Sequence, residues 1–175
     1  DTDASHLWMH RPYARLTRHW VLPDRLGSLA LCQTGRLLLG LAKGLYLADP
    51  DAAREETALS LEKLADVEAG NAETRINDGR SDRNGNFVFG TKSERSDNAP
   101  IGAFYQYSVR HGLRRLDLPA AAIPNSICFS ADGRRMYYCD SVEPRILCCD
   151  YDAGAAAVSG SRAFAEVDEA GASPD

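Results

Sequence analysis

The feature that most constrains this chain is a turn glycine that recurs at a nearly constant step. Gly35, Gly85 and Gly133 each follow a short polar turn and precede a strand-like segment, and they lie 50 and 48 residues apart. Each unit holds about four short segments of apolar or alternating residues, separated by glycine, proline, asparagine or aspartate. A period of about 40–50 residues with four strands per unit is typical of a β-propeller.

A β-sandwich is the alternative fold, because it also consists of many short strands. A sandwich requires neither a fixed period nor a glycine at the same place in each unit, so the propeller is favoured. Residues 52–69 are rich in helix-forming residues, but the repeat predicts an outer strand over 57–64 instead. The sequence therefore predicts an all-β fold with one partial propeller domain over 1–175, in blade units of roughly 1–25 (partial), 26–72, 73–122 and 123–175.

These three and a half to four units present a problem of closure. Propellers close with about four to eight blades, and an open ring leaves sheet edges unpaired. The chain is therefore expected to be either a small atypical propeller or part of a longer one. The family resemblance described below favours the second.

Composition excludes several classes of function. The net charge of -5 gives no basic surface, which disfavours nucleic-acid binding. No apolar run approaches the roughly 18 residues of a membrane-spanning helix, and no signal-peptide pattern is visible at the start. The five cysteines have no C-x-x-C spacing, which indicates strand packing rather than metal or redox chemistry. We therefore expect a cytoplasmic protein with no membrane partner.

Three isolated polar residues stand where a loop would present them to a ligand. Arg75 and Asn77 are two positions apart, so they share one face of an extended segment, and Asn125 precedes the next strand-like run. The alternatives are a solvated surface charge at Arg75 and a turn cap at Asn125. The residues alone leave both interpretations open.

Three aspartates stand close to glycines in the same stretch. Asp78 and Asp132 are each followed directly by glycine, and Asp82 precedes Gly85 by three residues. Aspartate accepts hydrogen bonds from the backbone of its own turn. All three are therefore predicted to be turn residues rather than metal ligands.

Two dense motifs identify a family. The string R-x-N-D-G-x-x-D-x-x-G-x-F begins at Arg75, and P-N-S-I-x-F-S-x-D-G-x-x-M-Y-Y-x-D-S begins at Pro124. Together they resemble the gluconolactonase/regucalcin (senescence marker protein) family, and the sugar-lactone hydrolases of that family, including arabinonolactonase-like members, are the most similar. The resemblance extends over the whole chain and implies a six-bladed propeller with one divalent ion (Ca²⁺, Zn²⁺, Mg²⁺ or Mn²⁺) in its central channel.

The resemblance also implies an activity and the residues that perform it. The activity is metal-dependent hydrolysis of a gluconolactone- or arabinonolactone-type sugar lactone to an aldonic acid. The implied metal ligands are Asn125 and Asp175, with Asp175 also acting as the catalytic base, and the implied substrate-binding residues are Arg75 and Asn77. The alternative is a non-catalytic propeller that binds a divalent metal or another protein.

The sequence departs from the family pattern in three places. Ser126 stands where glycine is commonest, and an acidic substrate contact of some members falls at Arg95, with Glu94 adjacent. The family's first metal ligand, a glutamate in an E-G-P motif, has no counterpart, so blades are expected to be missing on both sides. We therefore expect these 175 residues alone to hydrolyse sugar lactones poorly; the oligomeric state is left open.

Overall fold

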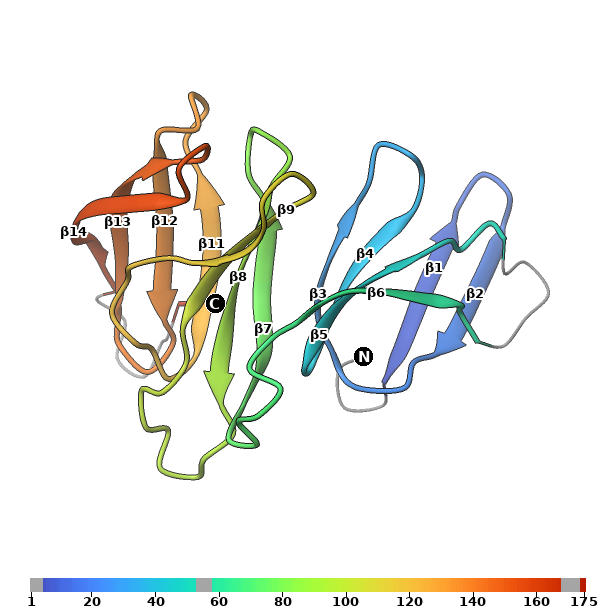
Figure 1. The fold of residues 1–175 in the computed structure, drawn as a ribbon, viewed down its shortest axis with the longest axis horizontal. Helices are drawn as coiled ribbons and strands as arrows, with labels where there is room; N and C mark the ends of the chain where they lie inside the picture. The colour runs from blue at the N-terminus through green and yellow to red at the C-terminus, as the bar shows by residue number, and fades with distance from the viewer. Residues whose placement is uncertain (1–4, 53–57, 168–173) are drawn as a thin grey trace.

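The computed structural model describes residues 5–52, 58–167 and 174–175. These residues form fourteen strands and no helix, so no described helix could cross a membrane. The strands make four antiparallel sheets (Figure 1). The first holds β1 (His6–Arg11) and β2 (Leu16–Val21); the second β3 (Leu26–Leu31), β4 (Leu37–Leu41), β5 (Gly44–Ala48) and β6 (Leu61–Asp66); the third β7 (Thr74–Ser81), β8 (Phe87–Ser93), β9 (Phe104–Ser108) and β10 (Gly112–Arg115); and the fourth β11 (Pro124–Phe129), β12 (Arg135–Asp140), β13 (Arg145–Asp152) and β14 (Ala157–Glu166).

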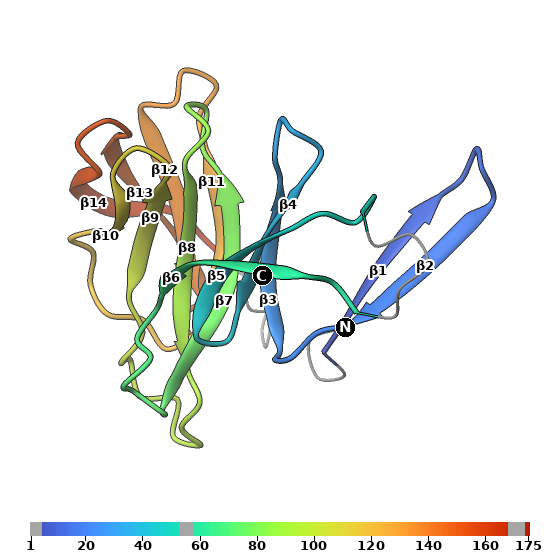
Figure 2. The same cartoon turned by 45° about the vertical axis from the view of Figure 1, so that its right-hand side comes forward.

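The sheets follow one another in chain order. Within each four-stranded sheet consecutive strands are neighbours, which is the meander of a propeller blade. The first strands of successive blades contact one another, β3 against β7 and β7 against β11, so they line the side on which the blades converge. Figure 2 shows the β1–β2 hairpin at one end of this row. The predicted partial propeller is confirmed, with three complete blades and one hairpin, and the sandwich is excluded.

The recurring glycines make the same turn in each blade. Gly35, Gly85 and Gly133 have φ of +83°, +82° and +70°, a left-handed conformation that only glycine adopts without cost. Each donates its N–H to the carbonyl three residues earlier, at 3.0, 3.4 and 3.0 Å. The repeat in the sequence is therefore a repeat of one turn between the first and second strand of every blade.

A separate apolar core lies between each pair of successive sheets. Trp20 and Leu39 belong to the first core, Phe89 to the second, and Phe104 and Met136 to the third; all are at most 1% exposed. Because both faces of the middle blades are covered, β4 is a nearly continuous apolar run, and β8 begins with one, Phe87 to Phe89.

The outer strand of the first complete blade lies later than the sequence predicts. It runs over Leu61–Asp66 rather than 57–64, while Ala58 makes only an isolated bridge to Val21. The bridge holds the chain beside the β1–β2 hairpin before β6 joins β5. The helix considered for 52–69 is absent from the described part of that stretch, and residues 53–57 lie outside the described residues.

Candidate functional site

The site is built on irregularities at the start of the three innermost strands. β3, β7 and β11 each contain a register shift against the second strand of their blade. A bulge bends a strand and redirects its side chains. The shifts fall between Leu26 and Ser28, between Ile76 and Gly79, and between Asn125 and Cys128.

Equivalent positions of the three bulges differ in side chain. Applying the glycine steps of 50 and 48 residues relates Gly27 to Asn77 and Asn77 to Asn125. The two asparagines meet: Asn77 Nδ2 donates to Asn125 Oδ1 at 2.8 Å and to the Pro124 carbonyl at 3.0 Å. The bulges of β7 and β11 therefore place two side-chain amides in direct contact across the blade boundary.

Arg75 joins this pair from the same strand. Its side chain is 11% exposed, and its Nη1 donates to the Ile76 carbonyl at 2.9 Å and to Asn77 Oδ1 at 3.3 Å. A guanidinium has five N–H donors, so these contacts use only part of them. The structure thus brings Arg75 and Asn77 together on one face, as their spacing predicts.

Asp175 lies on the other side of Asn125. Asn125 Nδ2 donates to Asp175 Oδ1 at 2.6 Å and to Ser141 Oγ at 2.9 Å. Ser141 Oγ donates in turn to the Pro174 carbonyl at 2.7 Å, which holds the segment that carries Asp175. All four predicted site residues therefore belong to one hydrogen-bonded chain; their catalytic and binding roles remain predictions.

The directions of these hydrogen bonds fix the orientation of the Asn125 side-chain amide. Its nitrogen uses both hydrogens, on Ser141 and Asp175, and its oxygen accepts from Asn77. Rotating the amide by 180° would set its Nδ2 against the Nδ2 of Asn77, two donors facing each other. The Asn125 oxygen therefore stays on the side of Asn77.

The donor set fits an oxygen-seeking divalent ion. An amide oxygen has two lone pairs, and the bond from Asn77 uses one of those on Asn125. The Asp175 carboxylate, which accepts from the nitrogen of the same amide, has further lone pairs free. Such ligands suit Ca²⁺, Mg²⁺ or Mn²⁺. The five cysteines are free thiols, and the described residues contain no group of three or more His, Cys, Asp or Glu that could hold an ion.

Asn125 and Asp175 open onto a cavity of about 380 Å³. Its lining combines the fourth blade's first strand with charged residues of β7. This places two predicted site residues at a space large enough for a small polar ligand. The lining residues are Asp78, Arg80, Asn125, Ser126, Ile127, Cys128 and Asp175.

Glu94 contacts the site, although the family resemblance aligns its neighbour Arg95 with the acidic substrate contact of the family. Its carboxylate accepts from Arg75 Nε at 3.0 Å and also pairs with Arg25. Burial raises the pKa of Glu94, but the hydrogen bonds and charges of Arg25 and Arg75 outweigh it, so the pKa lies below its ordinary value. Arg25 precedes Arg75 by 50 residues, the glycine step, so the repeat was a signal that could have found it. Arg95 instead pairs with Glu73 and Asp97, away from Arg75.

The aspartates predicted to make turns divide into two kinds. Asp82 Oδ1 accepts from the N–H groups of Asn84 and Asn86, and Asp132 Oδ1 accepts from the N–H of Arg134, so both act in turns as predicted. The prediction is wrong for Asp78. It lies inside β7, and its Oδ2 accepts the N–H of Ile127 on the next blade at 3.0 Å.

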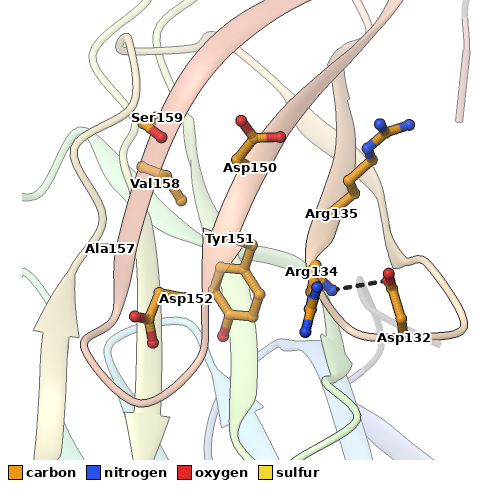
Figure 3. Close-up of a pocket in the computed structure, with 9 residues that line it drawn as sticks. All are labelled: Asp132, Arg134, Arg135, Asp150, Tyr151, Asp152, Ala157, Val158 and Ser159. Atoms are coloured by element: carbon orange, nitrogen blue, oxygen red, sulfur yellow. Dashed lines mark hydrogen bonds between the residues drawn. The ribbon is translucent and has the colours of Figure 1, made fainter.

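A second cavity, of about 570 Å³, lies on the fourth blade (Figure 3). Its acidic groups have local partners: Asp132 accepts from Arg134, as the dashed line shows, and Asp152 from Gly154 N–H at 2.9 Å. None of the predicted site residues lies there. We therefore place the candidate site at the first cavity. The residues that line the second are Asp132, Arg134, Arg135, Asp150, Tyr151, Asp152, Ala157, Val158 and Ser159.

Fold and site together define a β-propeller protein with a polar site where its innermost strands meet. All of residues 1–175 match the model of the SMP-30/gluconolactonase/LRE-like region, and the chain belongs to this family. It is 38% identical to the L-arabinolactonase of Azospirillum brasilense over 177 aligned residues, which cover 100% of the chain and 56% of that protein.

Solved structures give the same fold. A regucalcin from Agrobacterium tumefaciens, described as a calcium-binding protein, matches with a TM-score of 0.80 and 25% identity, over 93% of this chain and 52% of that one. A luciferin-regenerating enzyme matches with a TM-score of 0.82 and 24% identity, over 93% and 54%; this likeness supports the fold alone. The chain thus spans about half the length of these relatives.

Proposed function

We propose that this chain supplies part of the active site of a sugar-lactone hydrolase that opens arabinonolactone- or gluconolactone-type rings to aldonic acids. The observation that carries the proposal is the meeting of Arg75, Asn77, Asn125 and Asp175 in one hydrogen-bonded chain, beside a cavity. The substrate class comes from the L-arabinolactonase that matches over the whole length of the chain.

The reaction adds water to a cyclic ester. Water attacks the lactone carbonyl, the ring C–O bond breaks, and the ring oxygen leaves as a hydroxyl once protonated. Asp175 accepts the proton of the attacking water; its bond to Asn125 leaves carboxylate lone pairs free for this, which supports the assignment. The unused N–H groups of Arg75 donate to sugar oxygens, and Asn77 orients the Asn125 amide next to them.

One divalent ion belongs to this proposal. Asn125 through its oxygen and Asp175 through its carboxylate would hold it, and a bound ion polarises a carbonyl and lowers the pKa of water. Ca²⁺, Mg²⁺ and Mn²⁺ suit this oxygen set better than Zn²⁺.

The test is hydrolysis of arabinonolactone and gluconolactone, followed by acid release, with each ion added and with EDTA. We expect ion-dependent turnover that Asp175→Asn abolishes and that Asp132→Asn, on the exposed turn of the same blade, leaves intact. Turnover that is equal with Asp175→Asn would refute the assigned base. The prediction that residues 1–175 alone are impaired is tested by comparison with a longer version of the chain.

A non-catalytic metal-binding propeller is the second candidate. The likeness to a regucalcin described as calcium-binding favours it. Titration with Ca²⁺ or Mn²⁺ separates the two functions. Saturable binding that Asn125→Ala weakens, without hydrolysis of either lactone, would favour the second.

A further inference from the structure

Two adjacent residues of β7 both reach the neighbouring blade. In a regular strand, successive side chains point to opposite faces. Here Asn77 Nδ2 donates to Asn125 Oδ1, and Asp78 Oδ2 accepts from Ile127 N–H at 3.0 Å. The register shift between Ile76 and Gly79 allows this, because Asn77 and Asp78 lie inside the bulge.

The segment of β11 that they contact is itself irregular. Asn125 pairs with Cys139 and Cys128 with Tyr137, so Ser126 and Ile127 fall outside the paired register. Ser126 has φ of +57°, a left-handed conformation that is unfavourable for a non-glycine residue. A conformation of this kind persists only where its surroundings hold it.

Asn77 and Asp78 hold this irregular segment from both sides. On the N-terminal side of Ser126, Asn77 donates hydrogen bonds to the Pro124 carbonyl and the Asn125 side chain. On its C-terminal side, Asp78 accepts a hydrogen bond from the Ile127 N–H. The bond to a carboxylate is charge-assisted and hence stronger than a neutral one. The Ile127 side chain, 1% exposed, anchors the far end of the segment in the core.

We infer that Asp78 is a positioning residue for Asn125. It acts through the Ile127 N–H, which fixes the β11 bulge and with it the direction of the Asn125 side chain. The inference rests on the proposed function for its effect on hydrolysis, but the orientation of Asn125 can be measured without any activity. Asp78 also lines the cavity, so a direct role of its charge is the competing outcome.

The experiment compares Asp78→Ala with Asp78→Asn in the longer version of the chain. Asp78→Ala removes the acceptor, so we expect kcat/KM to fall about 10–100-fold, with most of the loss in kcat, as is usual when a supporting partner of a ligand is lost. Asp78→Asn keeps an amide oxygen in the same place, and we expect a loss below about 10-fold, because a neutral hydrogen bond has roughly half the strength.

The independent readout is the side-chain amide NMR signal of Asn125, assigned by its absence in Asn125→Ser. Asp78→Ala is expected to move this signal, and Asp78→Asn to restore it. Asp132→Ala is the matched control, because Asp132, like Asp78, accepts a backbone N–H of the fourth blade, at 3.1 Å, but lies outside the site cavity. Asp78→Ser, too short to reach Ile127, replaces the alanine variant if that variant does not fold.

The following results would overturn the positioning role of Asp78 or the proposed function. An unmoved Asn125 signal in Asp78→Ala, or an equal shift with Asp132→Ala, overturns the inference. A loss of activity in Asp78→Asn as deep as in Asp78→Ala also overturns it, since the charge rather than the bond then matters. If the longer version of the chain also hydrolyses no lactone, the proposed function fails, while the NMR signal still decides the positioning role.

Discussion

The innermost strands meet at two boundaries, β3 against β7 and β7 against β11, and the bulged segments pack differently at each. Between β3 and β7, the equivalent position of the bulge is Gly27, and the backbones themselves meet: a Cβ there would lie 2.4 Å from the Ile76 carbonyl oxygen. Between β7 and β11, Asn77 and Asn125 occupy that position and their amides fill the space. The same repeat position therefore lets two backbones pack closely at one boundary and carries contacting polar side chains at the next.

The difference also appears in how side chains cross each boundary. Across β3 and β7 the link is ionic and outside the bulges, where Glu94 accepts from Arg25 and Arg75. Across β7 and β11, Asn77 and Asp78 make links within the bulges, and Arg83 makes a further link outside them, to the Phe129 carbonyl. A site therefore forms between β7 and β11, where polar side chains of the two bulges contact each other directly.

The largest expected effect comes from Gly27→Ala. Its Cβ would meet the backbone of β7, which cannot move aside as a flexible side chain does, so we expect a loss of about 3 kcal/mol in the free energy of unfolding. Urea denaturation measures it. Gly70→Ala is the control, because nothing lies within 4 Å of the added atom. Equal stability of the two variants would show that β3 and β7 do not pack through their backbones.

Asn77→Asp tests the other boundary. The substitution keeps the shape but sets an acceptor against the Pro124 carbonyl and the Asn125 oxygen, so two bonds become repulsive contacts. We expect a loss of about 1–3 kcal/mol in the free energy of unfolding. We also expect kcat/KM for the lactone to fall about 10–100-fold.

Asn86→Asp serves as the comparison for this variant. Asn86 is also a bonded asparagine of the same blade, with Nδ2 on Asp82 at 2.7 Å, but it lies outside the site. A lower stability with unchanged kcat/KM is expected of it. If Asn77→Asp behaves in the same way, Asn77 has no part in the site.

The ionic link gives a smaller, pH-dependent effect. The pKa of Glu94 is held below its ordinary value of 4.5, so its contribution to stability is present above pH 4.5 and is lost as pH falls through the lower pKa of the folded state. The side chain is 24% exposed, and we expect up to about 1 kcal/mol. Unfolding of wild type and Glu94→Gln, measured from pH 7 to pH 3, should show a stability difference that shrinks with acid. A constant difference would contradict the pairing.

The smallest effect is expected from Ser126→Gly. Glycine removes the cost of the left-handed φ of +57° but adds chain entropy to the unfolded state, so the net gain should stay below about 1 kcal/mol. Thermal unfolding measures it, with Ser126→Ala as the variant that keeps the Cβ. A Ser126→Ala variant that is less stable than wild type would show that the serine hydroxyl also contributes to stability.

The blades can be predicted from local sequence patterns. A left-handed turn needs glycine, and so the spacing of Gly35, Gly85 and Gly133 is enough to mark the same turn in each blade. The same step relates Asn77 to Asn125, which is why local spacing could predict that they meet. The motif resemblance added Asp175, and the structure places its carboxylate 2.6 Å from Asn125.

The neighbours that complete the site depend on how the blades pack against one another. Glu94 rather than Arg95 faces Arg75, because that depends on the path of the loop after β8 rather than on spacing. From the sequence, Asp78 is predicted to be a turn residue, since an Asp-Gly pair is typical of turns. Its partner Ile127 is 49 residues away. The contact exists because two bulges, in strands of different blades, shift their registers so that a side chain and a backbone N–H come together, and no local pattern encodes such a coincidence.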